Sequence, residues 1–202
     1  MQEKLTKEQR RSLLLAAARK RFAQNGYHET SIDHIIQEAD VARGTFYLYF
    51  DGKRAIFDAI LSSAIDAINA NIKVIAVGAN EAPPAEQLKA NLRRCFTLLL
   101  DDKDLGQILF YRALGIDDVC VENLNDFYSQ IAALIASALN QGMALGLLAQ
   151  CDSLIVSHCV LGSIKEAFTS LIMNKNPGDE RLDRIIEEIL RLHFYGLYTR
   201  AI

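Results

Sequence analysis

Two short amphipathic segments joined by a tight turn occupy residues 30–53, and they restrict the possible folds more than any other feature of the chain. Apolar residues of the first segment recur at the three-to-four-residue spacing of a helix face: Ile32, Ile35, Ile36 and Ala39. Residues 40–42 have the length of the turn in a helix-turn-helix unit. The second segment, 43–50, places Phe46 and Phe50 on its inner side. The pattern predicts a helix-turn-helix.

Polar groups on the outer side of this unit suit a DNA surface. Arg43 can form a bidentate contact with a guanine edge, and Gly44 allows the backbone to approach closely. Thr30 and Ser31 can cap the first helix, and its first amides can bind a phosphate. The residues expected to face DNA are Thr30, Ser31, Arg43, Gly44, Thr45, Tyr47 and Tyr49, with core packing as the alternative role for the two tyrosines.

The run from Gly44 to Lys53 reads Gly-Thr-aromatic-Tyr-x-Tyr-Phe-x-x-Lys. This pattern resembles the signature of the tetracycline-repressor family of bacterial transcriptional regulators, and the similarity extends over residues 10–61. The resemblance implies a homodimeric repressor that binds palindromic DNA operators and responds to a small molecule. It also implies that Lys53, at the start of the fourth helix, contacts a DNA phosphate.

Three residues depart from that signature. Ala42 stands where a capping Ser or Thr is common, and losing such a cap costs about 1 kcal/mol. Leu48 occupies a position where Tyr is frequent. Arg54 replaces the usual Glu, and we expect its charge beside Lys53 to strengthen non-specific affinity for DNA.

Every periodic segment has helical spacing, which predicts an all-α fold of about nine helices. We expect a three-helix helix-turn-helix DNA-binding head in residues 1–54 and a larger helical effector-binding and dimerisation body in residues 55–202. The fourth helix begins at Lys53, and its apolar period continues to Ile75. Some 25 residues of helix form a rod of roughly 37 Å, whose tilt would change the spacing of two DNA-binding heads.

Charge is distributed unevenly along the chain. The net charge is −3, but residues 1–54 carry +3 and residues 55–202 carry −6. A basic head on an acidic body confines the attraction for phosphates to one end of the molecule. An asymmetry of this size also arises by chance in many proteins.

The body contains only general candidates for an effector pocket. Aromatic side chains at helical spacing can surround an apolar ligand and Arg112 can meet an anionic group, although ordinary core packing is the alternative for the aromatic residues. The candidates are Phe96, Phe110, Tyr111, Arg112, Phe127, Tyr128 and His158. The four cysteines lack the spacing of a metal site, so we expect buried thiols, no metal and no cofactor.

Residues 153–174 are apolar nearly all round, so a helix there must be covered on two sides. One side can be the core of the chain and the other a second copy, although a central helix in a monomer is the alternative. A two-fold dimer would hold two heads one DNA turn apart, roughly 34 Å. The expected interface residues are Leu161, Ile164, Phe168, Leu171, Ile186, Ile189 and Leu197.

Other functional classes fit less well. A di-iron helical-bundle enzyme needs Glu-x-x-His on two helices, and the sequence has none. The polar start of the chain does not resemble a signal sequence, and apolar runs such as 131–136 are too short to cross a membrane, so we expect a cytoplasmic location. The expected function is a DNA-binding repressor released by a largely apolar effector. Regulation by a partner protein, or without a ligand, is the alternative.

Overall fold

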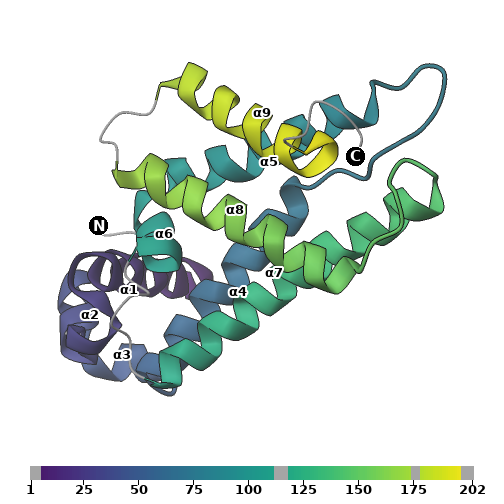
Figure 1. Cartoon of the computed structure of the whole chain (residues 1–202). Helices are drawn as coiled ribbons and strands as arrows, with labels where there is room; N and C mark the ends of the chain where they lie inside the picture. Colours follow the sequence, from purple (N-terminus) through teal and green to yellow (C-terminus); the bar gives the residue numbers. More distant parts are fainter. Residues whose placement is uncertain (1–5, 112–117, 174–177, 197–202) are drawn as a thin grey trace. The chain divides into compact units, whose positions relative to one another are not determined.

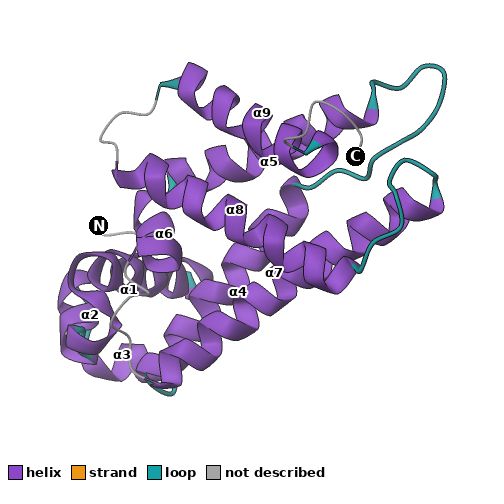
Figure 2. Cartoon of the chain, in the orientation of Figure 1, coloured by secondary structure: helices purple, strands orange, loops and turns teal. Residues whose placement is uncertain are grey.

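The computed structural model describes residues 6–111, 118–173 and 178–196, and this part of the chain contains helices and loops without a strand (Figure 2). The helices follow one another in the order α1 (Lys7–Glu29), α2 (Ile32–Glu38), α3 (Arg43–Tyr47), α4 (Lys53–Asn71), α5 (Pro84–Asp101), α6 (Lys103–Gly106), a π-helical turn η1 (Gln107–Tyr111), α7 (Asp118–Ala144), α8 (Ser153–Met173) and α9 (Asp179–Tyr195) (Figure 1). The predicted all-α class with about nine helices is confirmed.

The chain divides into two compact units. Unit 1 consists of residues 1–66 and 102–127, and unit 2 of residues 67–101 and 128–202. These units are defined by compactness. The boundary predicted at residue 54 is a functional one, between DNA binding and effector binding, and it stays a prediction.

The core of unit 1 contains a cluster of three aromatic rings, two from α1 and one from α4. The ring of Phe22 lies 5.4 Å from that of Tyr27 and 5.5 Å from that of Phe57, and the last two rings are 5.0 Å apart. All three side chains are buried, so they contribute much of the hydrophobic stabilisation of this unit. Gly26 adopts φ 81°, a left-handed conformation that interrupts the helix.

The same unit includes α6, which packs against α1. Asp102 precedes α6, and its carboxylate accepts a hydrogen bond from the backbone N–H of Leu105 at 3.0 Å. The other oxygen of this carboxylate forms an ion pair with Arg19 of α1. One side chain therefore caps α6 and attaches it to the first helix.

The fourth helix is shorter than the sequence predicts. It has 19 residues and a length of about 28 Å, in place of a rod that continues to Ile75. Residues 72–77 are not helical, and amide side chains of α5 bind their backbone. Asn91 exchanges two hydrogen bonds of 2.8 Å with the backbone of Lys73, and Gln87 exchanges bonds of 2.9 and 2.8 Å with Ala76. These bonds replace the ones that further helical turns would form. We call this pair of side chains the amide clamp.

Unit 2 contains α5, α8, α9, the end of α4 and the larger part of α7. Ion pairs join α5 to α9: Arg93 pairs with Asp183, and Lys89 pairs with Glu187 at 2.5 Å. The ring of Phe96 on α5 lies 5.7 Å from that of Phe168 on α8, and both side chains are buried.

Helix α8 is unusually apolar for its degree of burial. Its residues Ser153–Ile172 have a mean hydropathy of 1.2, and 22% of this stretch is buried within the chain. By length and composition alone this helix could cross a membrane, although one such helix is weak evidence. The expectation from the sequence was based on uninterrupted apolar runs. It did not consider a helix such as α8, whose mean hydropathy is high although small polar residues are scattered along it.

Candidate nucleic-acid interface and helical body

The first helix of the helix-turn-helix is capped by Ser31. Its Oγ accepts a hydrogen bond of 3.1 Å from the backbone N–H of His34, whose ring Nδ1 accepts one of 3.3 Å from the N–H of Ser31. Asp40 follows in the turn with φ 50°, a left-handed conformation that Asp tolerates better than most residues. The short recognition helix α3 then starts at Ala42 without a side-chain cap, as predicted. It is held by Phe46 and Phe50, which are both buried.

The outer face of α3 is accessible. Arg43 and Gly44 are exposed, and Tyr47 is 46% exposed, whereas Thr45 and Tyr49 are half-buried. A Cβ atom at Gly44 would find no atom of the protein within 4 Å. The fold itself therefore does not require glycine at this position, which leaves close approach of another molecule as a reason for it.

Arg43 is held in place by two neighbours. Its guanidinium forms an ion pair of 2.7 Å with Asp33 on α2. A hydrogen bond with Tyr47 and the charge of Asp33 raise the pKa of Arg43. Both ends of the ion pair are exposed, so it orients the guanidinium with little contribution to stability. A fixed, outward guanidinium is well suited to the edge of a guanine.

Thr30 has a structural role that differs from the one expected. Its side chain is only 1% exposed. The hydroxyl donates to the carbonyl oxygens of Gly26 and Arg21, at 2.7 and 3.1 Å. It therefore secures the end of α1 and is not available to a phosphate, whereas the neighbouring Ser31 is exposed. The sequence did not distinguish between these adjacent hydroxyl residues.

Lys53 also bonds within the protein. Its Nζ donates to the carbonyl oxygen of Tyr27 at 2.9 Å and to that of His28 at 3.2 Å. It lies 4.3 Å from the centre of the Tyr27 ring. A cation that satisfies the last carbonyls of a helix is favourable there. The phosphate contact that the family resemblance implies for Lys53 stays a prediction.

The charge of Arg54 is balanced by acidic residues, contrary to the expectation that it strengthens non-specific binding. Its guanidinium donates to the side chain of Asn123 at 3.2 Å. It lies 4.0 Å from carboxylate oxygens of Asp58 and Glu122. Burial raises the pKa of Asp58 even though Arg54 opposes this shift. Arg54 thus links α4 to the start of α7.

The residues expected around an effector do not form one site within either unit. Phe110 and Phe127 belong to unit 1, and Phe96, Tyr128 and His158 belong to unit 2. His158 is exposed on α8, and its role in an effector pocket stays a prediction. Arg112 and the side chain of Tyr111 lie outside the described part of the chain. Burial raises the pKa of Tyr128 to about 12.

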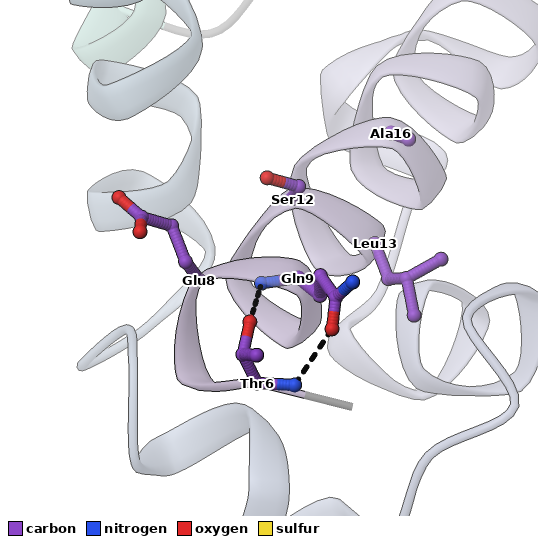
Figure 3. A pocket seen from close by; sticks show the side chains of 6 residues that line it. All are labelled: Thr6, Glu8, Gln9, Ser12, Leu13 and Ala16. Carbon is purple, nitrogen blue, oxygen red and sulfur yellow. Dashed lines mark hydrogen bonds between the residues drawn. The ribbon is translucent and has the colours of Figure 1, made fainter. Parts of the chain in front are cut away.

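A surface hollow lies instead along the first turns of α1 (Figure 3). The residues that line it are Thr6, Glu8, Gln9, Ser12, Leu13 and Ala16. Thr6 and Gln9 bond to each other's backbone as a capping box, so their polar atoms are already paired. Nothing in the sequence indicated a hollow here, and it contains none of the predicted effector residues.

The expected dimer residues mostly pack inside the single chain. Phe168, Leu171 and Ile186 are almost completely buried, and Leu161 and Ile189 are buried as well. Ile164 is half-buried, and Leu197 lies outside the described residues. The first turn of α8 is accessible instead, because Leu154 is 70% and Ile155 is 64% exposed. The single chain therefore buries for itself most of the side chains that were expected at the dimer interface.

The described residues contain no group of three or more His, Cys, Asp or Glu side chains that could hold a metal ion. Cys95 is half-buried, and burial raises the pKa of its thiol. Cys151 and Cys159 are exposed, which corrects the expectation that all four cysteines act as buried hydrophobic residues.

A capped helix-turn-helix with an exposed recognition face, in a chain whose described residues form helices and loops, is typical of DNA-binding transcriptional regulators. Residues 14–60 match the model of the bacterial regulatory proteins of the tetR family. This match covers the helix-turn-helix unit, and together with the curated relatives it supports a transcriptional regulator of the tetR type and not an enzyme.

Relatives and solved structures agree with this assignment. The chain is 24% identical to a fatty acid metabolism regulator protein of Bacillus subtilis, over 93% of this chain and 95% of the relative. The structure of the fatty acid degradation regulator FadR from Bacillus halodurans matches with a TM-score of 0.77 and 22% identity, over 98% and 100% of the two chains. FadR from Bacillus subtilis, solved in complex with stearoyl-CoA, matches with a TM-score of 0.77 and 23% identity, over 93% and 99% of the two chains.

Proposed function

We propose that this protein is a cytoplasmic, homodimeric repressor that binds a palindromic operator and is released by an effector with an acyl chain. The observation that carries the proposal is the exposed face of α3. There, Arg43 is oriented by Asp33, and Gly44 leaves open space for a close approach. Arg43 reads a guanine edge, and Thr45, Tyr47 and Tyr49 contribute further contacts. Ser31 and Lys53 contact phosphates.

Exposed apolar side chains at the start of α8 and the end of α9 support the homodimer. Leu154 and Ile155 on α8 and Leu192 and Phe194 on α9 are exposed apolar side chains of unit 2. Large exposed apolar patches usually mark interaction sites. A second copy covers such a patch with the same patch, because a two-fold interface is self-complementary. The dimer also supplies the two heads that a palindromic operator requires.

The proposed effector class rests on the relatives and on the apolar interior of unit 2. One relative regulates fatty acid metabolism, and a structural neighbour binds stearoyl-CoA. Phe96 and Phe168 supply an aromatic interior between α5 and α8 that suits an acyl chain. The alternatives are a regulator that responds to a partner protein and one without a ligand.

Helix α4 can couple the effector to DNA. It begins at Lys53 in the head, and its last turn is attached to α5, because Arg94 donates to the carbonyl oxygen of Asn71 at 2.9 Å. The amide clamp fixes the residues that follow. A movement of α5 around an effector therefore displaces the end of α4. The coupling must be reciprocal, so the operator weakens the effector by the same factor, typically about 5–150-fold.

Selection of binding sites from random DNA tests the DNA-binding part. We expect an enriched inverted repeat. Arg43→Ala should lose about 1–3 kcal/mol of binding free energy and accept more sequences. Arg184→Ala, which removes an exposed arginine of α9, serves as the matched control and should bind the operator as the wild type does. Failure to enrich any inverted repeat would refute the proposed operator.

Measuring operator affinity with and without dodecanoyl-CoA tests the effector part. We expect weaker operator binding when the acyl compound is present. An effector that binds but leaves operator affinity unchanged would contradict the coupling, and no binding at all would favour the alternatives without a ligand.

A further inference from the structure

A single cation lies on the inner side of the apolar helix α8. Lys165 is half-buried, and it follows Leu161 by four residues and precedes Phe168 by three, which places the three side chains on neighbouring positions of one helix face. Leu161 and Phe168 are both buried. The stretch Ser153–Ile172 around them is the apolar part of the helix described above. A charge at such a position is costly unless something compensates for it.

Among the described residues, an aromatic ring and not a carboxylate lies against the ammonium group of Lys165. The Nζ atom of Lys165 lies 3.6 Å from the centre of the Tyr128 ring on α7. Among the ion pairs formed by the described residues, none involves Lys165. The adjacent Glu166 is exposed and points about 100° away around the helix. A cation–π contact satisfies a cation less completely than a carboxylate does.

Burial affects both partners of this contact. It lowers the pKa of Lys165 and raises the pKa of Tyr128 to about 12. Tyr128 therefore stays neutral at physiological pH and cannot serve as the counter-ion of Lys165. The ammonium group keeps donors that a ring face does not use.

Buried aromatic side chains adjoin this cation. Phe168 lies one turn along α8 from Lys165, and its ring packs against Phe96 of α5. Helices α5, α7 and α8 thus bring aromatic side chains to the neighbourhood of one ammonium group. An anionic headgroup followed by a hydrocarbon chain has the matching arrangement of charge and apolar surface.

We propose that Nζ of Lys165 binds the anionic group of an amphiphilic acyl effector, with Tyr128 positioning the ammonium and the acyl chain lying along Phe168 and Phe96. This inference rests on the proposed function, because it specifies the chemistry of the same effector. The anionic group is a carboxylate in a free fatty acid and a phosphate in an acyl-CoA. Lys165 is a specificity-determining residue for ligand charge, and it separates acids from neutral lipids of equal chain length.

The test compares ligands of one chain length on the full-length protein. Calorimetric titration is performed with dodecanoate, dodecanoyl-CoA and the neutral 1-dodecanol against the wild type, Lys165→Met and Lys165→Arg. Methionine keeps most of the length of the side chain without its charge. Lys89→Met, which removes a lysine of the same unit that pairs with Glu187, is the matched control.

We expect Lys165→Met to bind an anionic acyl ligand about 10- to 100-fold more weakly, the effect of losing one charged hydrogen bond. Its affinity for 1-dodecanol should equal that of the wild type, which also shows that the variant is folded. Lys165→Arg should restore most of the affinity for anions. A loss confined to dodecanoate identifies the carboxylate as the bound group, and a loss confined to dodecanoyl-CoA identifies a phosphate.

Two results would overturn the proposal, and they can be told apart. If the wild type binds the anionic ligands and Lys165→Met binds them equally well, Lys165 does not bind the anionic group, and the proposal of an acyl effector is unaffected. If neither anionic ligand binds the wild type, both the proposed acyl effector and the proposed role of Lys165 are refuted.

Discussion

Replacing Lys53 with Met should affect stability and DNA binding together. The substitution removes two hydrogen bonds from an ammonium group to the last carbonyls of α1. A hydrogen bond to a charged group contributes about 1.5–3 kcal/mol when buried. Lys53 is only half-buried, so we take the combined loss as about 2 kcal/mol. For a chain of this size that lowers the melting temperature by about 4–8 °C.

The DNA part of this prediction concerns salt. One lost phosphate contact changes the slope of log affinity against log salt concentration by about 0.9. Operator titrations at several salt concentrations, below the melting temperature of the variant, measure that slope. Lys20→Met is the matched control, because Lys20 forms an exposed ion pair with Glu38 and its loss should cost at most about 1 kcal/mol.

The two measurements refute different parts of the reasoning. A melting temperature within experimental error of the wild type would show that the bonds to Tyr27 and His28 do not stabilise the head. An unchanged salt slope would show that Lys53 does not contact a phosphate.

Three further predictions concern stability and assembly. Thr30→Val should cost about 1–3 kcal/mol of folding free energy by leaving buried carbonyls unpaired, and at temperatures where the variant is folded its operator affinity should be normal, whereas Ser31→Ala should weaken both. Ile155→Glu should produce folded monomers in light scattering, whereas Leu161→Glu should unfold the chain in circular dichroism. Burial lowers the pKa of His193, so the folded state favours the neutral ring. The resulting stability is complete above the pKa of the unfolded state and is lost as the pH falls. Lowering the pH from 7.5 to 5.5 should therefore reduce the melting temperature of the wild type more than that of His193→Gln.

The sequence predicted those parts of the fold that depend on local periodicity and local caps. Phe46 and Phe50 were expected to face inward and do, and the glycine at position 26 ends the regular part of α1. The missing cap at Ala42 was also visible in advance. Such features are determined within a few residues of chain, so a pattern of three or four positions is sufficient to recognise them.

Features that depend on tertiary partners could not be predicted in this way. Thr30 and Ser31 are adjacent hydroxyl residues, and only the packing of α1 determines which one is buried. The two faces of α8 are both apolar, so the sequence alone does not indicate which one the chain covers for itself. The end of α4 was misplaced because its apolar period continues to Ile75, while α5, more than ten residues later, supplies bonds that compete with the helix.

The amide clamp has a consequence for how this region can change in evolution. Gln87 and Asn91 bond to peptide groups and not to side chains, so most substitutions in the linker at Lys73 and Ala76 leave the bonds intact. Proline is the exception, because each of these linker positions must supply an N–H. The two amides have no such freedom. A carboxylate, the nearest replacement in shape, accepts hydrogen bonds but cannot donate one to a carbonyl oxygen. Substitutions should therefore accumulate quickly in the linker and slowly at Gln87 and Asn91. The two helix positions are then constrained by the backbone of a loop and not by packing within their own helix.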